Sequence, residues 1–241
     1  MAQPHPILAV IPARGGSKGL PGKNLKILGD IPLIGHAIKL AQSITDIAQV
    51  IVSTDSPEIA AAANALGAET PFFRPPILAT DTAPMWPVIQ HALSSAREHY
   101  GVDYQSILLL DPTALGRTPL DIISAIQTLT DDESADGVIS VSEYEHNPLW
   151  YAVHQPNGYM QDLCPEGKTY TRRQDLPPVY RINGQYYLWR STFVQSTDNW
   201  RISDKLIPSP MSNPNLALID TPEDFNRAEE LVSLNLLWSP K

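Results

Sequence analysis

In "ILAVIPARGGSKGLPGKN" (residues 7–24) an apolar run passes directly into a basic, glycine-rich loop. The run 7–11 is short, β-branched and bounded by turn residues, as a strand buried on both faces is expected to be. The loop, 11–24, holds four glycines and two prolines beside one arginine and two lysines. It is too rich in glycine for a helix and too cationic for the core, so it predicts a loop that binds phosphate.

Three further predicted strands alternate with helical segments along the first two thirds of the chain. The helical segments show apolar spacing of three and four residues, and several begin at an N-cap residue. The predicted strands are 49–55, 106–112 and 137–142, and the predicted helices are 31–44, 56–68, 82–100 and 118–132. This βαβ series predicts an α/β fold with a mainly parallel sheet covered by helices, and ligands at the carboxyl ends of the strands.

The pattern changes after residue 143, where the chain becomes aromatic and rich in proline. The tripeptide "PNG" (156–158) predicts a turn between antiparallel strands. We therefore expect a core of 1–143 and 189–241 with an insertion, 144–188, that acts as a lid or a subunit contact.

The segment 216–237 returns to the earlier style, with a short strand followed by a helix. Thr221 with Asp224 three residues later predicts a capping box at the start of this helix. The C-terminal residues therefore complete the core, and the insertion lies between the two parts of the core in the sequence.

Composition narrows the class of protein. A chain of 241 residues with 43% hydrophobic content can bury the core of one large domain. The net charge of −9 argues against a nucleic-acid partner, although a few cations in one loop can still hold a small anion. The apolar stretch near the N-terminus meets Pro12 and Arg14 too early to span a bilayer, and Cys164 is the only cysteine. We expect a soluble cytoplasmic protein with no membrane contact.

The loop matches neither common nucleotide-binding fingerprint. The Walker pattern needs four residues between its glycines and then Lys followed by Ser or Thr, and the dinucleotide pattern lacks these cations. On composition alone, a solvated basic loop without a ligand is the alternative.

The loop resembles the signature of the sugar-acid cytidylyltransferases, specifically the acylneuraminate (CMP-N-acetylneuraminate) synthetases and their close relatives. The resemblance covers nearly the whole chain and continues in order through "VSTD" (52–55), "FFRPPILATDTA" (72–83), "LLLDPTALGRT" (109–118), "RRQDLPPVYRINGQYYL" (172–188) and "IDTPEDF" (219–225). It implies a three-layer Rossmann-like nucleotide-sugar transferase fold with a small antiparallel dimerisation insertion. It also implies a Mg²⁺-dependent homodimer that converts CTP and a 2-keto sugar acid, here of the nonulosonic type, into a CMP-sugar and pyrophosphate.

The resemblance assigns nucleotide-binding roles to six residues. Arg14, Ser17, Lys18 and Lys23 match positions that hold the triphosphate, and Asn24 and Arg74 match positions near the base and ribose. For Arg74 the alternative is packing on Phe72 or Phe73. For Asp55, at the end of the second predicted strand, the alternative to a site role is capping the helix that begins at Ser56.

Two departures from the sialic-acid pattern concern metal binding. Asp111 stands where relatives of the sialic-acid type carry glutamine. Relatives that activate 3-deoxy-manno-octulosonate carry an aspartate at about this place, which binds metal. Leu218 stands where the sialic-acid type carries the first aspartate of Asp-Ile-Asp-Thr. Since Mg²⁺ prefers carboxylate oxygens, we expect it to be shared between Asp111 and Asp220. Arg14, Lys23 and Asp220 are the expected catalytic residues. The alternative for Asp220 is an N-cap of the last helix.

The insertion carries the positions matched to the acceptor. Asn183 and Tyr187 match residues that contact the sugar acid, and Arg173 matches an arginine that a partner subunit contributes. Strand packing is the alternative for Tyr187, and a solvated hairpin is the alternative for Arg173.

Three other functions stay open at this point. Asp111 favours activation of an eight-carbon ulosonic acid. A nucleotidyltransferase that uses a sugar 1-phosphate or another NTP is a second possibility, and a non-catalytic sugar-nucleotide binder is a third. The sequence does not identify the acceptor, because selection depends on pocket shape and a few hydrogen bonds.

Overall fold

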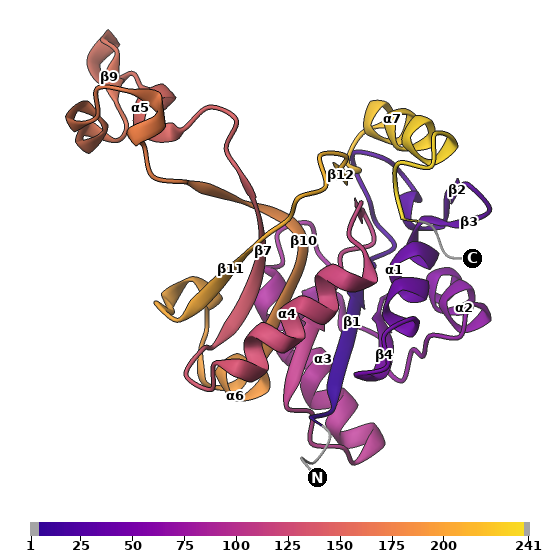
Figure 1. Cartoon of the computed structure of the whole chain (residues 1–241). Coiled ribbons are helices and arrows are strands. Elements are labelled where there is room, and N and C mark those ends of the chain that lie inside the picture. The colour runs from indigo at the N-terminus through magenta and orange to yellow at the C-terminus, as the bar shows by residue number, and fades with distance from the viewer. Residues whose placement is uncertain (1–4, 239–241) are drawn as a thin grey trace.

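The computed structural model describes residues 5–238 and has a six-stranded sheet at its centre (Figure 1). The strand order is β11-β7-β10-β5-β1-β4, and every strand of this sheet except β10 runs in the same direction. The strands are β1 (Ile7–Pro12), β4 (Ile47–Ser53), β5 (Ser106–Leu109), β7 (Gly137–Glu143), β10 (Tyr180–Arg190) and β11 (Leu206–Pro210). The predicted α/β fold with a mainly parallel sheet is confirmed.

Strand β1 is buried along its whole length, between β4 and β5. Its side chains alternate between the two faces of the sheet. Ala9 and Ile11 join one apolar cluster, whereas Leu8 and Val10 join the other. Both faces of this strand are covered, which explains why its sequence is apolar throughout rather than alternating.

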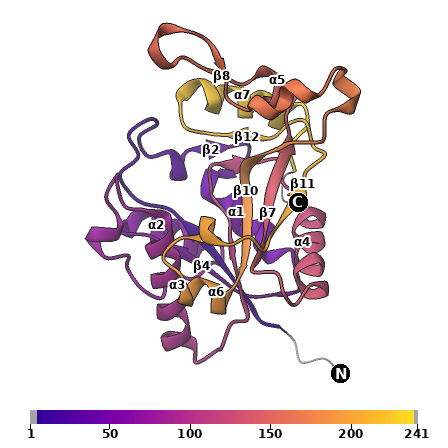
Figure 2. The ribbon, with the colours of Figure 1, turned by 90° about the vertical axis from the view of Figure 1, so that its left-hand side faces the viewer.

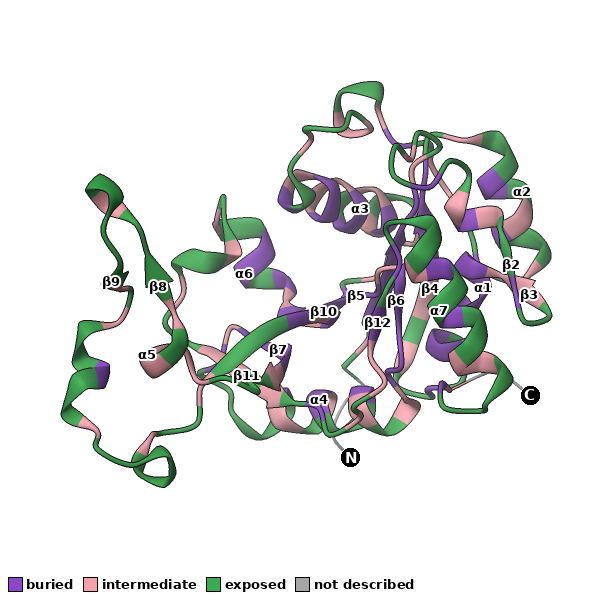
Figure 3. Ribbon diagram, turned by 90° about the horizontal axis from the view of Figure 1, so that it is seen from above, coloured by how far each residue is buried: buried purple, intermediate pink, exposed green. Residues whose placement is uncertain are grey.

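Helices cover both faces, so the core has three layers. One apolar cluster joins the sheet to α1, α2 and α4, and the other joins it to α3 and α6. In Figure 3, α3 and α4 lie on opposite sides of the sheet. The helices are α1 (Leu33–Gln42), α2 (Pro57–Ala65), α3 (Met85–Tyr100), α4 (Pro119–Asp131) and α6 (Ser191–Ser196). Each of the four helices expected before residue 143 is confirmed.

Strand β10 is the element that the sequence pattern did not place. Its residues 187–189 lie between β5 and β7 and pair with both in antiparallel fashion. The pairing with β7 shifts register between Ile182 and Tyr187, and Gly184 there has a φ of 71°. The expected boundary of the insertion, between residues 188 and 189, falls inside this strand. The division into core and insertion stays a prediction.

Residues 144–179 form an arm at the carboxyl end of the parallel strands (Figures 1 and 2). Figure 3 shows that most of the arm is exposed. The expected "PNG" turn lies between β8 and β9, and Asn157 there has a φ of 57°. The arm contains α5 (Pro148–Tyr151), β8 (Val153–His154) and β9 (Gln161–Asp162). The antiparallel pairing within the arm is therefore one short hairpin, and 3-10 turns supply much of the rest of the arm.

The C-terminal segment returns the chain to the carboxyl end of the sheet (Figure 2). Here β12 pairs with β6 in a small antiparallel sheet, and α7 follows with the expected capping box of Thr221 and Asp224. The remaining elements are β2 (Ile27–Leu28), β3 (Ile31–Pro32), β6 (Ala114–Leu115), β12 (Ala217–Leu218) and α7 (Pro222–Ser233). Within residues 5–238, no helix has the length and apolar character needed to cross a membrane.

Candidate functional site

The loop after β1, residues 13–22, leads into a 3-10 turn at Lys23–Leu25. Two glycines determine its path. Gly22 has a φ of 67°, and a Cβ atom on Gly19 would lie 2.4 Å from the carbonyl oxygen of Asp220. The loop can therefore approach the segment after β12 this closely because residue 19 has no side chain.

Asp55 fastens the loop to the end of β4. Its Oδ1 accepts a hydrogen bond from the backbone N–H of Gly15 at 2.8 Å. The alternative role of Asp55 as the cap of α2 is wrong, because Ser56 is the N-cap and its Oγ accepts from the N–H of Ile59. Asp55 therefore fixes the loop rather than the start of the helix.

Two cations of the loop share one carboxylate. Arg14 and Lys18 both form ion pairs with Asp81, which lies just before α3. The hydrogen bond from Lys18, and then that from Arg14, hold the pKa of Asp81 below its usual value. Sequence reasoning did not single out Asp81, and its only signal was its position within the matched block 72–83.

Lys23 pairs with Asp220 across the site. Its Nζ lies 2.8 Å from Oδ1 of Asp220 and donates to the carbonyl oxygen of Ile219 at 3.0 Å. The lysine side chain is 17% exposed and the aspartate side chain 75% exposed, so one partner is mostly buried and the other lies in solvent. The alternative role of Asp220 as the N-cap of α7 is wrong, because Thr221 occupies that position.

A cavity of about 320 Å³ gathers eight of the expected site residues, and we call it the basic cavity. These eight residues are Arg14, Ser17, Lys18, Lys23, Asn24, Arg74, Asp111 and Asp220. The lining is completed by Pro12, Gly19, Met85 and Thr113. The lining therefore contains four cations and two carboxylates, a set of charges that can bind an anionic ligand.

A second cavity, also of about 320 Å³, lies beside the first, and we call it the aromatic cavity. Its walls are Met85, Trp86, Ile89, Leu109, Asp111, Thr113, Gly184, Tyr187, Trp189, Trp200, Leu218 and Asp220. The two cavities share Met85, Asp111, Thr113 and Asp220. A charged compartment and an apolar compartment thus meet at two carboxylates.

Aromatic rings form one side of the second cavity. The ring of Tyr187 stacks on Trp189 at 5.3 Å between centroids and meets the edge of Trp200 at 5.7 Å. Burial raises the pKa of Tyr187, so its phenol stays neutral at physiological pH. Trp86 and Trp200 were not expected here, because no local pattern links them to the matched motifs.

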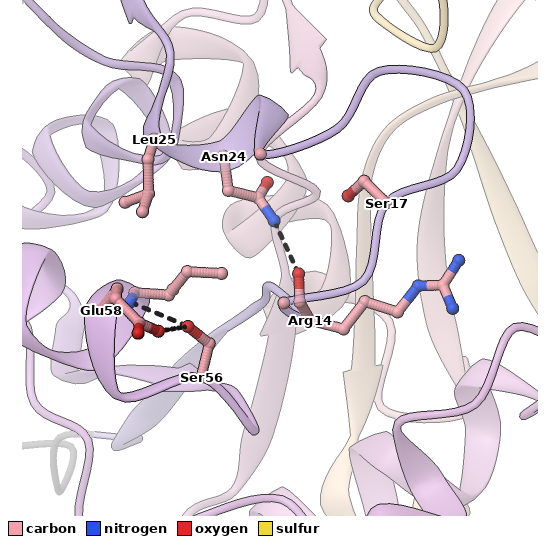
Figure 4. Close-up of a pocket in the computed structure, with 9 residues that line it drawn as sticks. Arg14, Ser17, Asn24, Leu25, Ser56 and Glu58 are labelled. Atoms are coloured by element: carbon pink, nitrogen blue, oxygen red, sulfur yellow. Dashed lines mark hydrogen bonds between the residues drawn. The ribbon is translucent and has the colours of Figure 1, made fainter.

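Arg74 and Asn24 are buried polar side chains of the basic cavity. Arg74 donates to Oγ of Ser53 at 3.1 Å and to its carbonyl oxygen at 2.5 Å. Burial lowers the pKa of Arg74 to about 10, which leaves it cationic at neutral pH. Asn24 donates to the carbonyl oxygen of Arg14 at 3.3 Å, and Figure 4 shows the Arg14 guanidinium pointing away from this contact. The smaller cavity shown in Figure 4 lies between the loop and the start of α2, and both contribute to its lining.

Arg117 links Asp111 to β10, a role that sequence reasoning missed. It is 3% exposed and donates to the carbonyl oxygen of Asp111 at 2.8 Å and to that of Gln185. Burial lowers the pKa of Arg117 to about 10, against the opposing effect of nearby Asp111. Asp111 itself accepts from the backbone N–H of Thr113 at 2.9 Å. Asp111 is therefore held firmly at the end of β5.

The structure does not bring Asn183 and Arg173 into either cavity. Asn183 is buried, donates to Oγ of Ser142 at 3.0 Å and accepts from the N–H of Gln185 at 3.2 Å. Arg173 lies in the arm and donates to the carbonyl oxygen of Glu145 at 3.4 Å. Their expected roles toward the sugar acid stay predictions, as does that of Tyr187.

Asp111 and Asp220 are the residues at the shared wall that can hold a metal ion. Among the described residues, no three His, Cys, Asp or Glu side chains gather as a metal site. Mg²⁺ commonly takes only one or two carboxylates and completes its shell with phosphate oxygens and water. Two carboxylates beside a cationic cavity therefore fit a magnesium ion that arrives with phosphates.

The sequence is similar to one protein family and to several known proteins along most of its length. The sequence profile described as "Cytidylyltransferase" matches residues 8–241. The chain is 34% identical over 233 residues to the CMP-N,N'-diacetyllegionaminic acid synthase of Legionella pneumophila, covering 95% of this chain and 97% of that protein. It is 32% identical over 193 residues to the post-translational flagellin modification protein B of Campylobacter coli, covering 80% and 81%.

Solved structures share the fold at lower identity. The CMP:2-keto-3-deoxy-manno-octonic acid synthetase complexed with CTP superposes with a TM-score of 0.70 at 19% identity, covering 95% of this chain and 99% of that one. The 4-diphosphocytidyl-2C-methyl-D-erythritol synthase from Anaerococcus prevotii gives a TM-score of 0.64 at 13% identity, covering 96% and 100%. The Rossmann-like nucleotide-sugar transferase fold expected from the sequence is confirmed.

Proposed function

Because the chain belongs to the cytidylyltransferase family, we propose that it transfers CMP from CTP to the anomeric hydroxyl of a nonulosonic, sialic-acid-like sugar acid and releases pyrophosphate. The observation that carries this proposal is the pair of adjacent cavities, one basic and one aromatic, that share Asp111 and Asp220. One cavity suits a nucleoside triphosphate, the other suits a sugar acid, and the reacting atoms meet at the shared wall.

The basic cavity is the CTP site in this proposal. Arg14, Ser17, Lys18 and Lys23 hold the triphosphate through charge-assisted hydrogen bonds. Lys23 and Arg14 stabilise the charge that develops on the transferring and leaving phosphates, because fixed cations require no reorganisation during the reaction. Asn24 and Arg74 lie beside the nucleoside.

The aromatic cavity places the acceptor. The anomeric oxygen bonds to the α-phosphorus of CTP while the bond from that phosphorus to the bridging oxygen of the β-phosphate breaks, and pyrophosphate leaves. The hydroxyl proton passes to a base at the shared wall, where the carboxylates are Asp111 and Asp220. Tyr187 contacts the sugar acid from β10. Holding both substrates in line at one wall lowers the entropic cost of the step.

Mg²⁺ is the proposed cofactor, with Asp111 and Asp220 as its protein ligands. When bound, it neutralises phosphate charge and polarises the phosphorus–oxygen bonds. Asp220 has one oxygen engaged with Lys23, so the same residue orients a cation and can offer its other oxygen to the metal.

We further propose a cytoplasmic homodimer, in which the arm contacts a second copy of the chain. Tyr159 and Met160, neighbours on the arm, are 77% and 75% exposed, so both can supply apolar surface to a contact between two chains. Arg173 then reaches the active site of the partner. Light scattering is expected to give twice the mass of one chain, and Tyr159→Ser with Met160→Ser is expected to give monomers. A monomeric wild-type protein would contradict the dimer. The proposed use of CTP supports a cytoplasmic location.

The function is tested by pyrophosphate release from CTP and Mg²⁺ with a panel of eight- and nine-carbon ulosonic acids. Release with a nine-carbon acid is expected. Release with only an eight-carbon acid would favour the second candidate, which the carboxylate at Asp111 supports. Silence across the panel would leave a non-catalytic binder.

A further inference from the structure

Asp81 forms ion pairs with two cations that line the basic cavity. The segment that carries it, residues 79–84, connects the 3-10 turn Pro76–Leu78 to α3. Its carboxylate pairs with Arg14 and Lys18, which lie 67 and 63 positions earlier in the chain. These are two of the four cations of that cavity.

We propose that Asp81 is a built-in competitor for the phosphates of the nucleotide: it binds Arg14 and Lys18 when the site is free and is displaced when CTP binds. The inference rests on the proposed function, because it assigns the displacing group to a triphosphate. A carboxylate and a phosphate oxygen recognise the same guanidinium and ammonium groups, so both cannot hold them fully at once.

The exposure of the three side chains makes this exchange feasible. The Arg14, Lys18 and Asp81 side chains are 30%, 81% and 35% exposed, respectively. Ion pairs at such exposure are weak individually, so a ligand with several phosphate oxygens can replace them. Lys23 differs, because it is 17% exposed and held by Asp220 and the carbonyl oxygen of Ile219. Lys23 thus remains oriented while Arg14 and Lys18 exchange partners.

The exchange reduces the apparent affinity for CTP. When the binding-competent state is only a fraction of the population, the apparent Kd rises by the inverse of that fraction. The same competition acts on pyrophosphate, so Asp81 recaptures the two cations as the product leaves. Asp81 therefore limits product inhibition.

Asp81→Asn tests the proposal directly, because it removes the charge and keeps the size of the side chain. Isothermal titration calorimetry with CTP and Mg²⁺, without acceptor, is expected to show roughly two- to tenfold tighter binding in D81N. Inorganic pyrophosphate is expected to inhibit this variant at correspondingly lower concentration. Asp81→Glu, which keeps the charge, is expected to retain the wild-type affinity.

Asp103→Asn is the matched control, since it removes an exposed ion pair with Arg97 of 2.7 Å on the far end of α3. Asp103→Asn is expected to leave the affinities for CTP and for pyrophosphate unchanged. If D81N binds CTP with the affinity of the wild type, or more weakly, the proposal that Asp81 competes with the phosphates is wrong. Weaker binding would show that Asp81 positions Arg14. If neither the wild type nor D81N binds CTP or pyrophosphate, the proposed function also falls.

Discussion

Lys23 Nζ lies 2.8 Å from Asp220 Oδ1, although 197 positions separate the two residues in the sequence. The contact joins the loop after β1 to the segment after β12, and Gly19 allows the two backbones to approach. It places a cation and a carboxylate at the wall of the basic cavity. The proposed reaction takes place at this wall.

Lys23→Met is expected to reduce kcat/KM for pyrophosphate release by about 10²–10³-fold, because it removes a fixed cation that stabilises charge in the transition state. Steady-state kinetics with varied CTP measure the effect. Lys205→Met, at an exposed lysine before β11, is the control and is expected to be neutral. An equally active Lys23→Met enzyme would remove Lys23 from the catalytic step.

Asp111→Asn and Asp220→Asn are each expected to raise the Mg²⁺ concentration needed for half-maximal CTP binding, by roughly tenfold or more, because each removes one proposed ligand. Calorimetry of CTP at varied Mg²⁺ gives this value without turnover. The melting temperature of Asp220→Asn should equal that of the wild type, since Thr221 rather than Asp220 caps α7. Unchanged Mg²⁺ dependence in both variants would rule out a shared metal.

Trp200→Ala is expected to raise the KM for the sugar acid about tenfold or more and to leave the KM for CTP nearly unchanged. The indole lies on the wall of the aromatic cavity and contacts the ring of Tyr187, so its loss opens the acceptor side only. Trp200→Phe keeps a ring and should recover most of the affinity. A larger effect on CTP than on the acceptor would contradict the assignment of the two cavities.

Stability is expected to fall in mild acid because of His36. This side chain is buried in α1, and burial lowers its pKa, against the effect of the hydrogen bond to the carbonyl oxygen of Leu28. The folded protein holds the neutral ring, whereas the unfolded chain takes up a proton near pH 6.5. The free energy of unfolding should therefore decrease as the pH falls from about 6.5 to the lowered pKa.

Chemical denaturation at pH 7.5 and 5.5 measures the dependence on His36. His36→Asn is expected to be less stable at both pH values but to lose less stability between them than the wild type. An equal loss in both proteins would show that His36 does not cause the acid sensitivity.

The local order of the fold could be predicted from the sequence. The strand at 7–11, the loop after it, and the capping box of Thr221 and Asp224 depend on residues close together in the chain, and all three are confirmed. Strand β10 could not be placed, because its pairing between β5 and β7 is decided by contacts with distant residues.

The same distinction applies to the site. The matched motifs predicted eight of the residues that line the basic cavity. Those after β1 and β5 follow parallel strands that end at the same edge of the sheet. Asp220 instead follows β12, which belongs to a separate two-stranded sheet. Asp81 and Trp200 were missed because their roles depend on partners that lie 67 and 13 positions away, in Arg14 and Tyr187. No periodicity or motif records such a contact.

Mass spectrometry of the nucleotide formed from CTP, Mg²⁺ and a nine-carbon 2-keto sugar acid tests the proposed reaction directly. We expect a single new species, in which CMP is joined to the sugar acid, together with one equivalent of pyrophosphate. Both products should be lost with Lys23→Met. Recovery of unchanged CTP, or of CDP and phosphate without a CMP-sugar, would contradict the proposed reaction.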